Sequence, residues 1–270
     1  MLHVVHGTKC NDGALAFLSV NPLYSMRGLF NQGNQMTRII RALCALGVLI
    51  LLGGCATTRS YTTLTVPSPA SVVSSSQGKI VVIDQVRDQR EFQVDPRDPS
   101  VPSLKEGADY QLNAEQRKAA IGRKRNGYGM AMGDYQLSSG QTVETLTHDL
   151  IATTLRSMGY QVSNGATAAP DAEHLNVIIH QFWAWMTPGF WTATIEAKLN
   201  TSLMFSGPSG EKSIEVAGYG RNQIQTGREA NWQLTYDRAF RDYQKNLQQA
   251  MRNSGFSFSS DRAHLRSRSR

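Results

Sequence analysis

Cysteine is scarce in this chain: the 270 residues include only Cys10, Cys44 and Cys55. If processing removes everything before Cys55, a single cysteine remains, which excludes an intramolecular disulfide framework. The sequence also lacks a G-x-S-x-G nucleophile motif and a conspicuous pair of carboxylates. These absences argue against a disulfide-stabilised module and against the common hydrolases.

A strong charge of one sign is missing as well. The formal net charge is +7, but residues 1–54 hold four basic residues and one acidic residue, so 24 basic and 20 acidic residues follow them. Much of the remaining excess lies in the last nine residues, at Arg262, Arg266, Arg268 and Arg270. A nearly neutral folded part is not typical of a dedicated nucleic-acid-binding protein, so we expect no nucleic-acid partner.

Long hydrophobic runs are absent too. The longest apolar run, residues 42–52, has 11 residues, whereas a transmembrane helix needs roughly 20. Arg38 and Arg41 precede this run, and two glycines follow it directly before Cys55. A basic start, a short apolar core and a small-residue cleavage site are the three parts of a secretory signal peptide. We predict that residues 36–54 are this signal, that translation begins at Met36, with Met26 as the alternative, and that residues 1–35 are a disordered upstream extension.

The segment Leu52-Gly53-Gly54-Cys55 resembles the lipobox of bacterial lipoproteins. The resemblance implies that Cys55 becomes the first residue and carries acyl chains. Ala56, in place of an aspartate, implies sorting to the outer membrane, facing the periplasm. Each buried methylene contributes about 0.8 kcal/mol, so several chains make a stable anchor. The alternative, a buried apolar helix ending in Gly-Gly-Cys, would require three independent features to coincide.

The mature chain divides into a tether, a domain and a tail. Residues 55–77, rich in Thr, Ser, Val and Pro, are predicted to be a flexible tether, and residues 256–270 a basic disordered tail. Residues 78–255 are predicted to form one domain with a polar, poorly periodic insertion at about 85–137. A short helix is expected within that insertion, at 114–121.

Two periodicities define the fold of this domain. Apolar residues at helical spacing predict amphipathic helices at about 138–158 and 231–251. Residues 80–83 and 160–162 predict strands, and three alternating stretches between residues 175 and 216 predict an antiparallel meander. We therefore predict an α+β, two-layer sandwich: a mostly antiparallel sheet with two amphipathic helices on one face.

Cap residues refine these boundaries. Ser138 and Gln141 have the spacing of a capping box, Gly159 stands where a left-handed C-cap is expected, and Asn231 is expected to cap the last helix.

Three short segments carry a family resemblance: Met158-Gly159-Tyr160, the strand at 175–179, and Val216-Ala217-Gly218 before the last helix. Together with the lipobox, they resemble the YajG-like outer-membrane lipoproteins over roughly residues 78–252. The resemblance implies a binding or structural lipoprotein with no catalytic residues and no cofactor. The order of elements is also similar to that of periplasmic lipoproteins that activate peptidoglycan synthases or assemble secretion channels.

Five aromatic residues form the first candidate contact surface: Phe182, Trp183, Trp185, Phe190 and Trp191. Strict alternation would place Trp183 and Trp185 on one face of the sheet and Phe182 on the other. Packing under the helices accounts for only one of these faces, so we consider a partner or ligand surface at the hairpin tip. Core packing is the alternative.

Arg123-Lys124-Arg125 is the second candidate surface. Three adjacent cations before a glycine-rich segment can contact anionic lipid head groups or a polyanionic cell-wall polymer. A solvated turn is the alternative, and the sequence favours it.

Two pairs of residues have spacings that can hold a metal: Glu144 with His148, and His174 with His180. Glu144 and His148 fit an exposed charge pair on a helix, and the polarity between His174 and His180 is that of an ordinary sheet edge, so we predict no metal site.

These features favour a non-catalytic, lipid-anchored envelope protein that binds a protein complex, peptidoglycan or lipopolysaccharide. The first alternative is an accessory factor for envelope assembly, either a peptidoglycan synthase activator or a secretion-channel subunit. The second is a cell-wall hydrolase, which would have to use Asp95, Asp98 and Glu106 of the insertion.

Overall fold

The computed structural model describes one part of the chain in detail, and all of it lies within a compact unit of residues 53–270. The described residues are 59–69, 79–94, 96–104, 114–126, 128, 130–164, 171–225 and 227–255. The predicted upstream extension, signal peptide and basic tail, and Cys55 itself, lie outside these residues.

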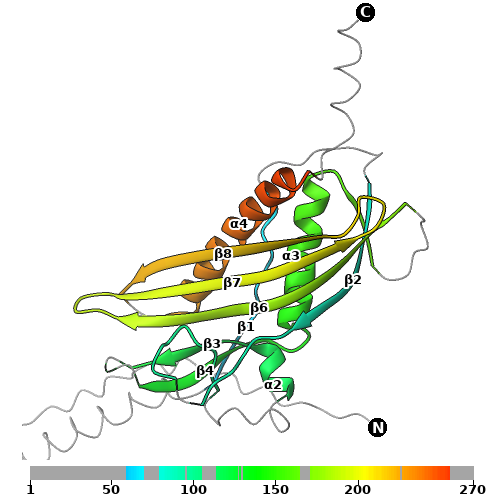
Figure 1. Ribbon diagram of the computed structural model, residues 1–270. Helices are drawn as coiled ribbons and strands as arrows, with labels where there is room; N and C mark the ends of the chain where they lie inside the picture. The colour runs from blue at the N-terminus through cyan, green and yellow to red at the C-terminus, as the bar shows by residue number, and fades with distance from the viewer. Residues whose placement is uncertain are drawn as a thin grey trace, which may run out of the picture. The chain divides into compact units, whose positions relative to one another are not determined.

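The described residues form eight strands and three helices (Figure 1). In chain order these are β1 (Ser60–Thr62), β2 (Ile80–Asp88), α2 (Ala114–Ala119), β3 (Ala120–Arg125), β4 (Ala131–Leu137), α3 (Val143–Ser157), β5 (Gln161–Asn164), β6 (Glu173–Pro188), β7 (Ala193–Ser206), β8 (Lys212–Ile224) and α4 (Glu229–Asn253). The strands form one open sheet, in which most of the paired residues belong to antiparallel strands. Helices α3 and α4 cover one face of this sheet. The predicted α+β sandwich is confirmed.

The long strand β6 organises the sheet. On one side it pairs antiparallel with β7, and β7 pairs antiparallel with β8, which confirms the predicted meander. On its other side, the first half of β6 pairs with β2 and the second half with β3, both in parallel. Beyond β2 lies β5, and beyond β3 lie β4 and then β1.

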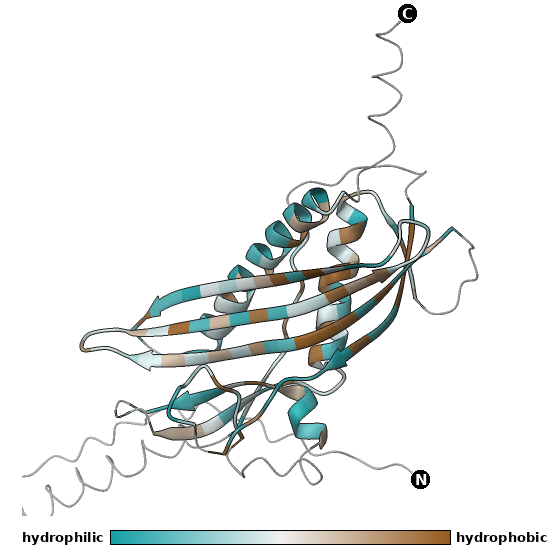
Figure 2. Cartoon of the chain, in the orientation of Figure 1, coloured by the Kyte–Doolittle hydropathy of each residue, from teal (hydrophilic) through white to brown (hydrophobic). Residues whose placement is uncertain are grey.

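The main core lies between the sheet and the two long helices. Phe182 stacks against Tyr236 with ring centroids 5.3 Å apart, and both side chains are fully buried. Helix α4 lies directly on β8, since a Cβ added to Gly220 would stand 2.1 Å from the carbonyl oxygen of Thr235. Figure 2 shows hydrophobic residues on α3 and interspersed along β6 to β8.

A β-bulge in β6 decides which residues face the helices. The register with β7 shifts between Ile179 and Gln181. Because the extra residue reverses the alternation, Phe182 joins the helix-side core, whereas Trp183 and Trp185 turn to the opposite face. Trp183 and Trp185 thus lie opposite Phe182, as predicted, but strict alternation from Ile179 would have placed them on the helix side, and the bulge reverses this.

The first described residues are packed against the domain. Strand β1 pairs with β4, Leu64 is buried, and the Pro67 carbonyl accepts a 2.8 Å hydrogen bond from the Gln244 amide. The predicted flexible tether at 55–77 is thus corrected for residues 60–69. The insertion at 85–137 contains the expected short helix, but also strands β3 and β4, which the sequence did not predict.

The helix caps partly match the predictions. Helix α3 starts with a capping box of Thr142 and Thr145, four residues later than the predicted Ser138–Gln141 pair. Gly159 has φ +88°, which confirms the left-handed residue after α3. Helix α4 begins after Arg228 without a side-chain cap, so the predicted capping role of Asn231 is wrong.

Candidate functional site

The sheet face opposite α3 and α4 is partly covered by a strap, the described residues 89–94 and 96–104. The strap and the sheet enclose a small second apolar cluster: Phe92, Leu104, Ala120, Trp183 and Trp185. Phe92 meets Trp183 edge to face at 6.0 Å, and the Trp183 indole N–H donates to the Pro99 carbonyl at 3.2 Å. This second cluster, absent from the prediction, accounts for aromatic residues on both faces of β6.

Three of the five aromatic candidates therefore belong to the core. Phe182 and Trp183 have no exposed surface, and Trp185 is 9% exposed. Phe190 and Trp191, in the turn between β6 and β7, are 90% and 85% exposed. Their rings meet edge to face with centroids 4.8 Å apart. The predicted aromatic surface is thus reduced to these two residues.

The guanidinium of Arg90 holds the strap onto the sheet. It binds both carboxylate oxygens of Asp88, at 2.8 and 2.7 Å, and donates to the carbonyls of Ala120 at 2.6 Å and Phe182 at 2.9 Å. The Arg90 side chain has no exposed surface. A buried charge needs such partners, so this network holds the first residues of the strap against the sheet.

The basic segment 123–125 forms hydrogen bonds with the second part of the strap. Arg123 donates to the Leu104 carbonyl at 3.0 Å, and Arg125 donates to the Pro96 carbonyl at 3.3 Å. Both arginines are less than 10% exposed, and Lys124 donates to the Ser60 hydroxyl at 2.5 Å. The prediction of a polyanion-binding surface is wrong for the two arginines, since they are buried against the strap.

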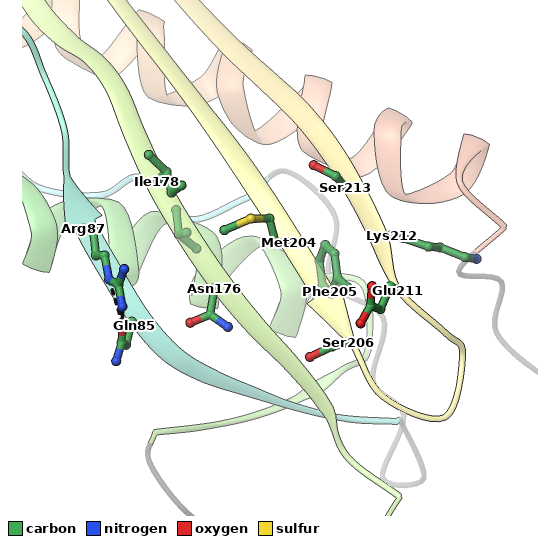
Figure 3. Close-up of a pocket in the computed structure, with 11 residues that line it drawn as sticks. Gln85, Arg87, Asn176, Ile178, Met204, Phe205, Ser206, Glu211, Lys212 and Ser213 are labelled. Atoms are coloured by element: carbon green, nitrogen blue, oxygen red, sulfur yellow. Dashed lines mark hydrogen bonds between the residues drawn. The ribbon is translucent and has the colours of Figure 1, made fainter.

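Beyond the strap, the same sheet face carries the sheet hollow, a pocket of about 560 Å³. Its lining residues come from β2, β6, β7 and the start of β8 (Figure 3): Gln85, Arg87, Asn176, Val177, Ile178, Met204, Phe205, Ser206, Glu211, Lys212 and Ser213. Sequence reasoning missed this site, because its residues come from four strands and share no motif.

The sheet hollow combines an apolar centre with a charged and polar rim. Ile178 and Met204 supply the apolar surface, and Met204 is 38% exposed. The Arg87 guanidinium is oriented by a 2.7 Å hydrogen bond from its Nε to the Gln85 side chain. Lys212 extends toward the end of α4, where its ammonium donates to the Ser254 carbonyl at 2.8 Å (Figure 3). Such a surface can hold an elongated ligand carrying both polar and apolar groups.

The histidines flagged by the sequence have local partners. His174 contacts the Asp84 carboxylate at 3.0 Å, His180 contacts the Ser202 hydroxyl at 2.6 Å, and His148 contacts Asp149 at 3.0 Å. In the part of the chain that the structure describes, no three His, Cys, Asp or Glu side chains gather as metal ligands.

Of the three carboxylates required by a hydrolase, Asp95 and Glu106 lie outside the described residues. Asp98 accepts a 2.8 Å hydrogen bond from the Ser100 backbone N–H, which lowers the pKa of its carboxyl. A lowered pKa favours the ionised form, whereas the general acid of a glycosidase needs a raised pKa.

Comparison with known proteins gives a few remote structural similarities. No protein-family model and no curated protein matches the sequence. A solved structure of an uncharacterized protein is similar over 72% of this chain and 98% of its own, with 10% identity and a TM-score of 0.35. A Xanthomonas campestris protein of the family DUF330 is similar over 70% of this chain and 92% of its own, with 11% identity and a TM-score of 0.39.

A third similar structure is a Helicobacter pylori protein described as a proposed homolog of a neuraminyllactose-binding hemagglutinin. It covers 73% of this chain and 100% of its own, with 11% identity and a TM-score of 0.30. Among the described helices, none is both long enough and apolar enough to cross a membrane.

Proposed function

We propose that the protein is a non-catalytic lipoprotein, anchored in the outer membrane by acyl chains on Cys55, that binds another envelope component in the sheet hollow. The observation that carries the binding role is the sheet hollow itself. Its volume of about 560 Å³ lies in the range of ligand sites, and it combines an apolar centre with a polar rim.

The way in which the two faces of the sheet are covered supports a binding role for the sheet hollow. Helices α3 and α4 pack on one face, and the strap is pinned over part of the other by buried arginines. Among the described residues, no helix or strap covers the sheet hollow, and its side chains Arg87 and Glu211 are exposed. Opposite charges flanking an apolar centre suit a peptide or a glycopeptide, such as the cross-linked peptides of peptidoglycan.

The anchoring role rests on the sequence. A basic start, a short apolar run and Gly-Gly before Cys55 favour lipidation, and Ala56 favours the outer membrane. Membership of the YajG-like lipoproteins is part of the same proposal. An accessory role in envelope assembly would use the same anchor, with a protein as the ligand of the sheet hollow.

The anchor is tested by intact mass and membrane fractionation of the wild type beside Cys55→Ser. We expect a wild-type product that lacks residues 1–54, is heavier by acyl chains and fractionates with the outer membrane. The serine variant should lack the acyl mass. An unprocessed, soluble wild type would contradict the proposal.

The binding role is tested by co-sedimentation of the lipidated protein with purified peptidoglycan. We expect Ile178→Arg and Arg87→Glu to lose binding. Gln223→Arg, at an exposed position on β8, is the control and should bind as the wild type does. If all forms bind equally, the sheet hollow is not the peptidoglycan site. If none binds, photo-crosslinking from position 204 in cells decides whether a protein is the ligand.

A further inference from the structure

One end of the domain carries exposed hydrophobic residues in two separate turns. Tyr128 and Met130, between β3 and β4, are 92% and 61% exposed, and Phe190 and Trp191, between β6 and β7, are 90% and 85% exposed. Single exposed apolar residues are normal on a protein surface, but two aromatic-bearing turns at the same end require an explanation.

The sheet register places both turns at this end. β3 runs parallel to β6, with Gly122 beside Ala184 and Arg123 beside Trp185. The turns that follow these two strands therefore leave the sheet in the same direction, as Figure 1 shows. We call residues 128, 130, 190 and 191 the aromatic tip.

The chain also enters the domain from this end. β1 runs parallel to β4, and β4 runs antiparallel to β3, so β1 points away from the aromatic tip. Ser60 pairs with Tyr135, which pairs with Gly122, which pairs with Ala184. The N-terminal side of Ser60 in β1 therefore faces the tip.

The segment between Cys55 and Ser60 is long enough to reach the level of the aromatic tip. Cys55 lies five residues before Ser60, a span of at most about 18 Å. β6 continues four residues beyond Ala184 to Pro188, a rise of about 13 Å, before the turn that holds Phe190. A lipid on Cys55 would thus hold this end of the domain against the bilayer surface, with the aromatic tip at the same level as the anchor.

We propose that the aromatic tip inserts into the head-group region of the membrane that holds the acyl chains of Cys55. This inference rests on the proposed lipid anchor. Tryptophan and tyrosine prefer that region because one part of the ring is apolar and another part is polar. The sheet hollow lies at the opposite end of β6 and β7. With the tip in the membrane, the hollow lies at the end of these strands that is farther from the bilayer.

Trp191 provides the test, because Trp183, Trp185 and Trp232 are buried and Trp191 is exposed. The purified lipidated protein is reconstituted into phosphatidylcholine vesicles with or without brominated acyl chains, which quench tryptophan on contact. We expect bromine-dependent quenching of the wild type and none of Trp191→Phe. A matched control, Trp191→Phe with Met204→Trp, moves the reporter to the sheet hollow and should also stay unquenched.

The intact mass of each preparation separates the two proposals. If the protein carries acyl chains but Trp191 is no more quenched than the reporter at position 204, the membrane contact is wrong and the anchor stands. Such a tip would be available to a protein partner instead. If no acyl chain is present, the anchor is wrong and the membrane contact falls with it.

Discussion

The carboxylate of Asp242 on α4 accepts a 3.0 Å hydrogen bond from the backbone N–H of Tyr219, which lies on the outer edge of β8. Two neighbouring positions on that edge are bound in the same way. Asn246 donates to the Ala217 carbonyl at 2.8 Å, and Arg238 donates to the Arg221 carbonyl at 2.5 Å. Side chains of one helix thus occupy backbone groups that would otherwise pair with another strand.

Removing this cover is expected to promote association. In Asp242→Ala with Asn246→Ala, the N–H of Tyr219 and the carbonyl of Ala217 lose their partners, and the edge of β8 becomes able to pair with a second copy. We expect concentration-dependent dimers or larger species by sedimentation velocity. Asp237→Ala, which removes an equal charge from the exposed face of α4, should remain like the wild type. Identical sedimentation of both variants would contradict the protective role.

Arg90 is expected to be critical for stability. Arg90→Met removes the guanidinium that pairs with Asp88 and donates to the carbonyls of Ala120 and Phe182, and breaking a buried charge pair costs about 3–5 kcal/mol. Urea denaturation followed by far-UV circular dichroism measures the change. Arg97→Met removes an exposed guanidinium of the same strap and should change stability by less than about 0.5 kcal/mol.

Gly220 is expected to tolerate no side chain. A methyl group there would meet the backbone of α4, so Gly220→Ala forces the helix away from the sheet and costs about 1–3 kcal/mol. The thermal midpoint should fall accordingly. Gly227→Ala, where an added Cβ meets nothing within 4 Å, is the control. Equal midpoints for the two variants would show that α4 is not packed this closely on β8.

Tyr160 is expected to make stability fall in alkali. Burial, and secondarily the charge of Glu173, raise the pKa of Tyr160 to about 12, whereas an unfolded tyrosine ionises near 10. The unfolded state therefore loses its proton first, and the stabilisation present below pH 10 disappears between about pH 10 and 12.

Chemical denaturation across that pH range measures the effect, which amounts to at most about 1.4 kcal/mol per pH unit for one group. Tyr160→Phe should flatten the decline. Tyr128→Phe, at a 92% exposed position, should leave it unchanged. A wild-type stability that does not change between pH 10 and 12 would contradict the raised pKa.

The elements with a strong local period could be predicted from the sequence. The α+β sandwich followed from three local signals. These are the helical spacing of apolar residues before Gly159, the alternation through β7 and the turns on either side of β7. Strands β3 and β4 were missed because their residues include Arg123, Arg125 and Asp134, which read as polar and are nonetheless buried. Asp134 pairs with Arg59, and the two arginines donate to the carbonyls of Leu104 and Pro96, which are partners too distant in sequence for a local window to contain.

The amphipathic faces are properties of adjacent residues, so the sequence by itself determined the fold class. The compartment predicted from the signal-like segment before Cys55 rests on the sequence alone. Tertiary structure alone decided which aromatic residues are buried. One extra residue at the bulge of β6 moved Trp183 and Trp185 to the face under the strap, and the turn after Pro188 left Phe190 and Trp191 in solvent. The sheet hollow is likewise a tertiary property, because its lining comes from four strands that only the register brings together.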